Sequence, residues 1–409
     1  MARQFEIPLF YRSPILSVVK NARKNQDRHK RDFAPSVLDL GSMRFKLARH
    51  FGFCYGVENA IEIAYRAIEE NPGKRIFLLS EMIHNPQVNR DLTDRGVQFL
   101  MKTDGTKLIP FEELRSDDIV IVPAFGTTLE MFDSLAKIGI DPQTYNTTCP
   151  FVEKVWNRSE QMGSQGYTII IHGFDNHEET RATFSHARRS APSVMIRNMQ
   201  EAIRLAAYVR GERDSASFFE EFPGRYSIGF DPTKDFERIG VVNQTTMLAT
   251  ETQEIADYLK NAVIARAGAG NLSFHFADTR DTLCYATSEN QESVYGLLES
   301  GGDLAVVVGG YNSSNTSHLV ELCEKKLPTY YVKDAEEILS RDRIRHLDLA
   351  SGKIIETDGW LPVNSSRPVE ILVTAGASCP DAVVDRVIDR MAALAGLRDR
   401  IEDALRVFA

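Results

Sequence analysis

Three cysteines stand where a predicted strand or loop gives way to a predicted helix, and they are the residues best suited to chemistry. They are Cys54, Cys149 and Cys284, separated by 95 and 135 residues. The dipole of a helix N-terminus favours the thiolate, which is the form of cysteine that binds metals. Three thiolates can hold zinc together with a histidine. They can equally hold three irons of a 4Fe–4S cluster and leave the fourth iron without a protein ligand.

The alternative is that each cysteine is a small buried apolar residue, which is the usual fate of a free thiol. Cys323 lies inside a predicted helix and Cys379 follows a loop of small residues, so we place both outside the metal site. The count of five cysteines is odd, their spacing is wide and no CxxC pair occurs. These features argue against a disulfide framework and favour a reduced compartment.

Polar loops follow the predicted buried strands and form a second candidate site. The loops are residues 82–85, 177–180, 243–246, 312–317 and 375–378. Ligands collect at the carboxyl ends of the strands in α/β sheets. Hydroxyls, amides, imidazoles and helix N-termini, with few Lys or Arg, indicate an anion pocket built from neutral donors. Helix capping by Ser and Asn is the alternative, but it accounts for only part of the polar run 312–317.

His177, Glu178 and Glu179 match the first half of a zincin helix, but Arg181 stands where the second histidine belongs. This departure argues against metalloprotease chemistry. Glu179 is a candidate proton donor beside the anion pocket. The alternative is a solvated residue on a helix face.

Buried apolar runs alternate with helical patterns along the chain, which predicts an α/β fold with parallel sheets. The spacing of the three cysteines suggests three similar α/β units around a common centre. We expect a basic extension at 1–43 and domains at 44–149, 150–280 and 281–409, with the strand at 44–50 joining either the first or the third. The charged, turn-rich residues 211–237 are interpreted as an insertion or connection.

The 409 residues carry a formal net charge of −9, so the chain has no general electrostatic reason to bind nucleic acid or an anionic membrane. No apolar run approaches the ~20 residues of a membrane span. Residues 1–43 differ, with eight Lys or Arg against four acids. We interpret them as a basic amphipathic arm on a cytoplasmic protein. The alternative is a plastid transit peptide, which is usually richer in Ser and poorer in acids.

These motifs, in this order, resemble the family of 4-hydroxy-3-methylbut-2-enyl diphosphate reductases over residues 44–395. The matching motifs are Gly52-Phe53-Cys54, Gly56-Val57, His84-Asn85, Thr148-Cys149-Pro150, His177 with Glu179, Gln244-Thr245-Thr246, Cys284 with Ala286-Thr287, Asn312-Ser313-Ser314-Asn315 and Thr374-Ala375-Gly376-Ala377-Ser378. The arm, the segment 211–237 and Pro123-Ala124-Phe125-Gly126 are similar to the longer branch of plants and cyanobacteria.

The resemblance implies three α/β domains in a trefoil around a central 4Fe–4S cluster with one open iron. Cys54, Cys149 and Cys284 would hold the cluster. The resemblance assigns the substrate diphosphate to His84, His177, Ser313, Ser314, Asn315 and Ser378. Glu179 would supply a proton and Thr245 would position the substrate hydroxyl. Ferredoxin or flavodoxin would donate the electrons, and the products would be isopentenyl and dimethylallyl diphosphates.

One residue departs from the family pattern. The shorter bacterial branch has a histidine at the position of Phe125, and phenylalanine cannot donate its hydrogen bond to the diphosphate. Phe125 is therefore left out of the predicted site. Two other functions remain as alternatives: a zinc hydrolase that uses the three cysteines and His84, and an iron–sulfur sensor that holds a cluster without turnover.

Overall fold

The computed structural model describes residue 11 and residues 13–29, 31–277, 282–362 and 366–408. The expected boundary at 280/281 and the start of the basic extension lie outside these residues. The chain forms two compact units. The terminal unit comprises Met1–Glu58, His84–Gln87 and Tyr285–Ala409, and the central unit comprises Asn59–Ile83 and Val88–Cys284.

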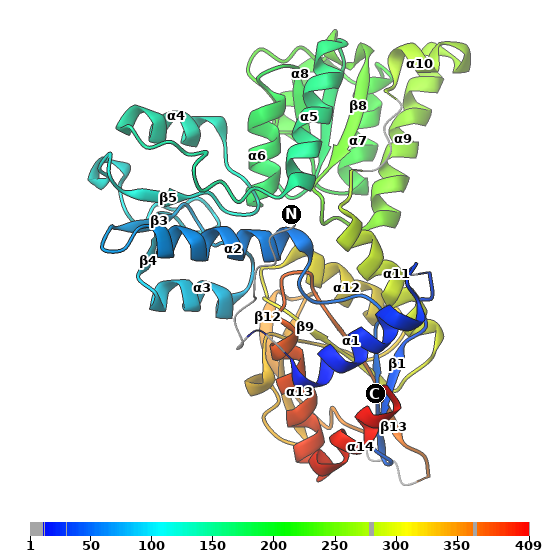
Figure 1. The fold of residues 1–409 in the computed structure, drawn as a ribbon. Helices are drawn as coiled ribbons and strands as arrows, with labels where there is room; N and C mark the ends of the chain where they lie inside the picture. The colour runs from blue at the N-terminus through cyan, green and yellow to red at the C-terminus, as the bar shows by residue number, and fades with distance from the viewer. Residues whose placement is uncertain (1–10, 12, 30, 278–281, 363–365, 409) are drawn as a thin grey trace. The chain divides into compact units, whose positions relative to one another are not determined.

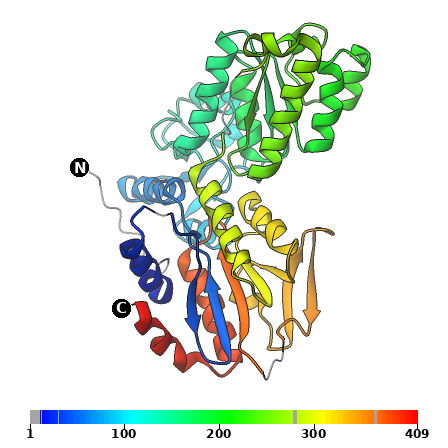
Figure 2. The ribbon, with the colours of Figure 1, turned by 90° about the vertical axis from the view of Figure 1, so that its right-hand side faces the viewer.

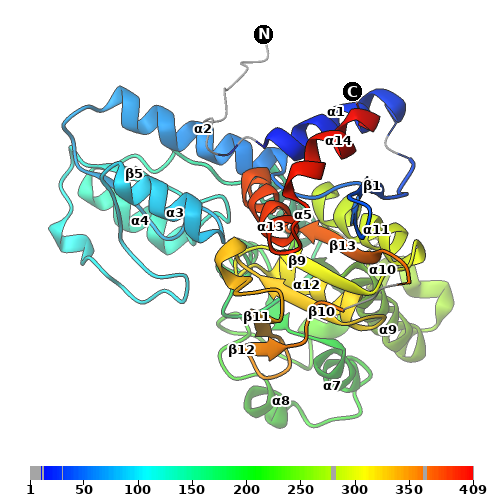
Figure 3. The ribbon, with the colours of Figure 1, turned by 90° about the horizontal axis from the view of Figure 1, so that it is seen from below.

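The central unit contains two three-stranded parallel sheets, of order β4-β3-β5 and β7-β6-β8. The strands are β3 (Ile76–Leu78), β4 (Val97–Phe99), β5 (Ile119–Ile121), β6 (Thr168–His172), β7 (Ser193–Ile196) and β8 (Ile239–Asn243). The helices are α2 (Tyr55–Glu70) and α3 (Pro86–Asp94), which both begin in the terminal unit, α4 (Leu129–Ile138), α5 (Pro150–Ser164), α6 (Glu178–Ala187), α7 (Met199–Val209), α8 (Ser215–Glu221), α9 (Ala249–Ala267) and α10 (Leu272–His275). Figure 3 shows α3 and α4 beside the first of these sheets.

Within the central unit, polar contacts join helices of the expected first domain to helices of the expected second domain. The backbone N–H of Leu129, at the start of α4, donates to Ser185 Oγ of α6 at 3.0 Å. Arg188 pairs with Glu130 at 2.6 Å. These bonds hold the two sheets' helical layers together.

The sheet β7-β6-β8 is buried on both faces, as its near-continuous apolar strands predict. Ile170 lies in one hydrophobic cluster, whereas its neighbours Ile169 and Ile171 lie in another. Successive strand residues point to opposite faces of the sheet, so a run of isoleucines contributes side chains to both clusters. Helices α5 and α6 cover one face and α7 and α9 the other (Figure 1).

The segment 211–237 is part of this core. It contains α8, and four of its five phenylalanines, Phe218, Phe222, Phe230 and Phe236, lie in the cluster that α7 and α9 cover. The ring centroids of Phe218 and Phe222 are 5.1 Å apart, and those of Phe218 and Phe230 are equally close. The segment has a charged, turn-rich sequence, which suggested an insertion. Its buried aromatic side chains nevertheless contribute apolar surface to the core.

The terminal unit is built on one seven-stranded mixed sheet of order β1-β2-β13-β9-β10-β11-β12. Its strands are β1 (Ser36–Asp39), β2 (Met43–Leu47), β9 (Leu304–Val308), β10 (Thr329–Val332), β11 (Arg343–Asp348), β12 (Lys353–Asp358) and β13 (Val369–Ala375). Its remaining helices are α1 (Pro14–Gln26), α11 (Tyr285–Glu299), α12 (Ser314–Glu324), α13 (Asp381–Leu394) and α14 (Ile401–Leu405). The four strands β2, β13, β9 and β10 are parallel, whereas β1, β11 and β12 add antiparallel pairs at the edges. The strand expected at 44–50 thus joins the last sheet, through β13.

The N-terminal helix α1 packs on α13 (Figure 2). The buried carboxylate of Asp385 accepts hydrogen bonds from the backbone N–H groups of Ile15 at 3.0 Å and Leu16 at 3.2 Å. Ile15, Leu16 and Val19 are buried, so α1 is amphipathic, as expected. Among the described residues, we find no helix long and apolar enough to cross a membrane.

Candidate active site

In the terminal unit, several predicted site residues follow neighbouring parallel strands. Cys54 comes after β2, Ser378 after β13, and Ser313 after β9. Because these strands are adjacent and parallel, their carboxyl ends lie at one edge of the sheet. The backbone N–H of Cys54 donates to the carbonyl of Ala377 at 3.2 Å, which fixes the cysteine loop against the Ser378 loop.

His84 belongs to the same edge although it is distant in sequence. Its carbonyl oxygen accepts a hydrogen bond from Ser378 Oγ at 3.3 Å. A side chain at Gly310 would collide with that carbonyl, so the close approach requires glycine. His84 itself is buried.

The polar run 312–317, expected as a loop, is partly helical, because α12 already begins at Ser314. Ser313 caps this helix and accepts a bond from the N–H of Thr316 at 3.3 Å. The amide oxygen of Asn315 accepts from the N–H of Ala377 at 2.9 Å. Some polar groups of the run 312–317 are therefore engaged in capping α12 and in fixing the neighbouring loop. The remaining groups lie at the N-terminus of α12, whose positive dipole end attracts anions.

In the central unit, Glu179 and Thr245 meet at the carboxyl ends of the parallel strands β6 and β8. The carboxylate of Glu179 accepts from the backbone N–H of Thr245 at 2.5 Å and from Thr245 Oγ1 at 3.0 Å. Glu179 is only 1% exposed. Burial raises the pKa of Glu179 to about 7, and the two bonds from Thr245 oppose the rise. The group is thus a carboxylic acid that holds a proton near neutral pH.

His177 precedes α6 and caps it. Its Nδ1 accepts from the backbone N–H of Glu179 at 3.1 Å. In the neutral imidazole this arrangement puts the proton on Nε2, where it can serve as a donor. The ring of Phe125 stands edge-on to His177, with centroids 5.5 Å apart. Phe125, which we left out of the site, therefore packs against one of its members.

Gln244 belongs to one of the matching motifs, but no role was predicted for it. Its side chain is fully buried, and Oε1 accepts from the N–H of Phe174 at 3.1 Å and from Thr180 Oγ1 at 2.9 Å. Its Nε2 donates to Thr246 Oγ1 at 2.8 Å. Gln244 and Thr180 are the chain neighbours of Thr245 and Glu179, so this network fixes the pair. Its place in a polar loop after a buried strand was the available signal.

Cys149 and Cys284 both belong to the central unit, and Cys284 lies close enough to influence the thiol of Cys149 electrostatically. The N–H of Cys149 donates to the carbonyl of Ala124 at 2.9 Å, and the N–H of Cys284 to that of Thr245 at 3.1 Å. Burial raises the pKa of the Cys149 thiol to about 11, and charge on Cys284 and Glu179 adds to the rise. The sequence predicted a lowered pKa at this helix N-terminus. Burial outweighs the N–H groups of α5, so a thiolate here needs a positively charged partner.

The five cysteines are all free thiols. Cys323 and Cys379 are fully buried, and burial raises the pKa of both. Within the described part of the chain, no three His, Cys, Asp or Glu side chains form a metal-binding group. Cys54 belongs to the terminal unit, and Cys149 and Cys284 belong to the central unit. Soft thiol donors of this kind suit an iron–sulfur cluster or zinc.

Each predicted site residue thus lies at the carboxyl edge of a sheet or on a segment packed there. The terminal unit contains Cys54, His84, Ser313, Ser314, Asn315 and Ser378. The central unit contains Cys149, His177, Glu179, Thr245 and Cys284.

Comparison with known proteins places this arrangement in a family. Residues 45–392 match the profile of the LytB protein. The chain belongs to the LytB family. Two relatives of the family, from Gloeobacter violaceus and Microcystis aeruginosa, are named 4-hydroxy-3-methylbut-2-enyl diphosphate reductase. The first is 39% identical over 367 residues, which cover 88% of this chain and 85% of that protein. The second is 40% identical over 355 residues, which cover 87% and 85%.

Solved structures share the α/β fold of this LytB chain. A structure described as (E)-4-hydroxy-3-methyl-but-2-enyl diphosphate reductase, the terminal enzyme of the non-mevalonate pathway, has a TM-score of 0.50 and 24% identity, covering 85% of this chain and 98% of that one. The reductase from Plasmodium falciparum has a TM-score of 0.61 and 20% identity, covering 86% and 88%. The expected α/β fold class is confirmed.

Proposed function

We propose that this chain reductively removes the hydroxyl group of 4-hydroxy-3-methylbut-2-enyl diphosphate. The products are isopentenyl and dimethylallyl diphosphates, and the reaction is the last step of the methylerythritol phosphate route to isoprenoids. The observation that carries the proposal is LytB membership over residues 45–392, in a chain whose buried Glu179–Thr245 pair holds a proton near neutral pH.

The reaction consumes two electrons and two protons, breaks the C–O bond and releases the oxygen as water. Glu179 supplies one proton, because its pKa of about 7 leaves about half of the groups protonated at neutral pH. Thr245 Oγ1, which is fixed by its bond to Glu179, orients the substrate hydroxyl.

The diphosphate is held by neutral donors. His177 offers Nε2–H, since its Nδ1 is engaged by the N–H of Glu179. The N-terminus of α12 offers backbone N–H groups. The other proposed contacts are His84, Ser313, Ser314, Asn315 and Ser378. Phe125 donates no hydrogen bond, but its ring fixes the orientation of His177.

A 4Fe–4S cluster with three protein ligands and one open iron fits the thiol donors, and Cys54, Cys149 and Cys284 would hold it. When bound, it supplies electrons singly and a Lewis-acidic iron. Zinc with His84 as the fourth ligand is the competing occupant.

Ferredoxin is the proposed electron donor, with flavodoxin as the alternative. We place the enzyme in the cytoplasm, because free thiols and an oxygen-sensitive cluster suit a reduced compartment.

Anaerobic purification followed by metal analysis and turnover tests the proposal. We expect brown protein with about four irons per chain, and product when dithionite and a viologen are added. Colourless protein that contains zinc would refute the cluster. Cluster-loaded protein that makes no product would instead support a sensor.

A further inference from the structure

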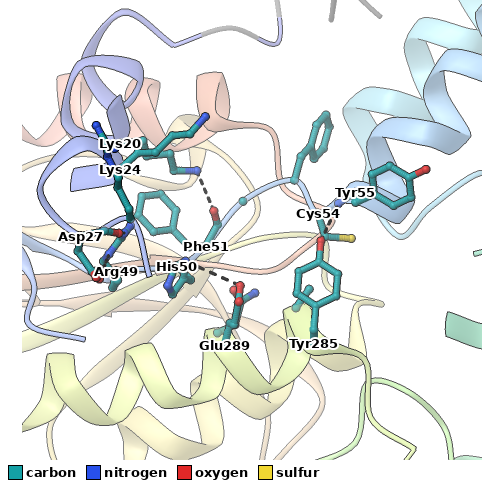
Figure 4. A pocket seen from close by; sticks show the side chains of 15 residues that line it. Lys20, Lys24, Asp27, Arg49, His50, Phe51, Cys54, Tyr55, Tyr285 and Glu289 are labelled. Carbon is teal, nitrogen blue, oxygen red and sulfur yellow. Dashed lines mark hydrogen bonds and ion pairs between the residues drawn. The ribbon is translucent and has the colours of Figure 1, made fainter. Parts of the chain in front are cut away.

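A pocket of about 300 Å³ lies in the terminal unit, beside the loop that carries Cys54. Helix α1 and the residues just after it line one side, and the first turns of α11 line the other. Cys54 is part of the pocket wall and is partly exposed. Figure 4 shows Cys54 between the two tyrosines Tyr55 and Tyr285.

The pocket is basic, although the chain as a whole carries −9. Four cations line it, against the two acids Asp27 and Glu289. The cations are Lys20, Lys24, Arg28 and Arg49.

Two of these cations are used within the fold. Lys20 bonds to Asp381 at 2.7 Å and to the carbonyl of Phe51 at 2.8 Å. Arg49 stands 3.7 Å from Asp27. Lys24 and Arg28 are exposed and form no ion pair with the described residues. Their positive charge is therefore exposed to solvent and can attract an acidic partner protein.

The other rim of the pocket is aromatic. Tyr55 is 58% exposed and Tyr285 is 38% exposed. The backbone N–H of Tyr55 donates to the hydroxyl of Tyr285 at 3.3 Å, so the two tyrosines are held together (Figure 4). Exposed tyrosines next to cations are typical of the centres of protein–protein interfaces.

Helix α1, which carries Lys20 and Lys24, is anchored to the rest of the terminal unit. Asp385 and Ser13 cap the first turn of this helix, and Lys20 anchors its middle. The LytB match begins at residue 45, so α1 lies outside the segment that defines the family. The helix adds a charged face next to a proposed cluster ligand.

We propose that this pocket and its rim form the docking surface for an acidic one-electron carrier protein of the ferredoxin type. Lys24 and Arg28 attract the carrier, and Tyr55 and Tyr285 pack against it. The inference rests on the proposed function, because each turnover needs two electrons. Two carriers would bind in succession, and each would be oxidised by one electron, which would pass to the cluster that Cys54 is proposed to help hold.

The test compares two double variants that change net charge equally. Lys24→Glu with Arg28→Glu reverses the outward charge at the pocket. Arg341→Glu with Lys353→Glu is the control, since Lys353 lies on β12 and both residues are exposed. That strand is at the opposite edge of the sheet from β1 and β2. Binding of an acidic [2Fe–2S] ferredoxin is measured by calorimetry at about 50 mM and 200 mM salt.

We expect the pocket variant to weaken ferredoxin binding about tenfold or more at the lower salt concentration. Wild-type binding should weaken as salt is added, and the control should bind like the wild type. With ferredoxin as donor, KM for ferredoxin should rise in the pocket variant while kcat at saturation is kept. Turnover with a net-neutral sulfonated viologen should be unchanged in both variants.

Equal affinity of wild type and pocket variant would overturn the docking surface, and so would an equal loss in the control. Loss of binding to anionic lipid vesicles or to inorganic phosphate, with ferredoxin binding intact, would also overturn it. Absence of viologen-driven turnover in the wild type would refute the proposed function, while the calorimetry would still decide the docking surface.

Discussion

Replacing Glu179 tests the proton-donor role most sharply. Its pKa of about 7 means that the protonated fraction falls about tenfold between pH 6 and pH 8. A group whose pKa is raised holds its proton below that value and loses it above. We therefore expect kcat to decline about tenfold over this range in the wild type. Glu179→Gln keeps an acceptor for the N–H of Thr245 but has no proton to give, so kcat should fall about 100-fold or more.

The assay is anaerobic turnover with a viologen across pH 6 to 9, together with iron analysis. The Glu179→Gln protein should contain as much iron as the wild type, because Glu179 is not a proposed cluster ligand. Its residual rate should lose the decline between pH 6 and pH 8. A flat profile in the wild type, or the same decline in the variant, would remove Glu179 from the role. Near-normal rates in the variant would do so as well.

Three further changes address the cluster, the network behind the acid and the N-terminal helix. Cys54→Ser, Cys149→Ser and Cys284→Ser should each lose stable iron, whereas Cys323→Ser should keep about four irons per chain; a fully loaded Cys149 variant would contradict the ligand assignment. Gln244→Ala removes the side-chain hydrogen-bond partner of the Phe174 N–H, of Thr180 Oγ1 and of Thr246 Oγ1, so we expect about 2–3 kcal/mol lower stability in denaturant melts and a lower kcat with unchanged KM. Gln253→Ala, on the exposed side of α9, is its control, and an unchanged kcat would show that Gln244 does not position the pair. Asp385→Ala removes the acceptor for two N–H groups of α1, so hydrogen exchange in the first turn of α1 should accelerate and the stability of the protein should fall by about 1–2 kcal/mol. Asp389→Ala is the control, and equal protection of α1 in the two variants would contradict the capping role.

The parallel core of both units was predictable, because fully buried parallel strands are continuous apolar runs. The largely apolar runs 304–308 and 370–374 are of this kind, and they lie in β9 and β13. Their carboxyl ends then placed Ser313 and Ser378 side by side by a general rule of such sheets. The same rule brought Thr245 to Glu179.

Tertiary contacts decided what the sequence did not predict. The edge strands β1, β11 and β12 lack continuous apolar runs, and all of β12 is exposed or partly exposed. Phe218 and Phe222 lie in a charged segment, so their place in the core depends on α7 and α9. The direction of the pKa shift of Cys149 depends on how deeply the thiol is buried, and its position at a helix N-terminus did not reveal that. Capping of α1 by Asp385 joins residues 370 positions apart.

The most direct test of the central claim is the electron balance of anaerobic turnover. Reduced viologen and 4-hydroxy-3-methylbut-2-enyl diphosphate are mixed with the cluster-loaded enzyme, and oxidised viologen and products are counted together. We expect two electrons to be consumed for each molecule of isopentenyl or dimethylallyl diphosphate formed. Viologen oxidation without either product, or product without two electrons, would contradict it.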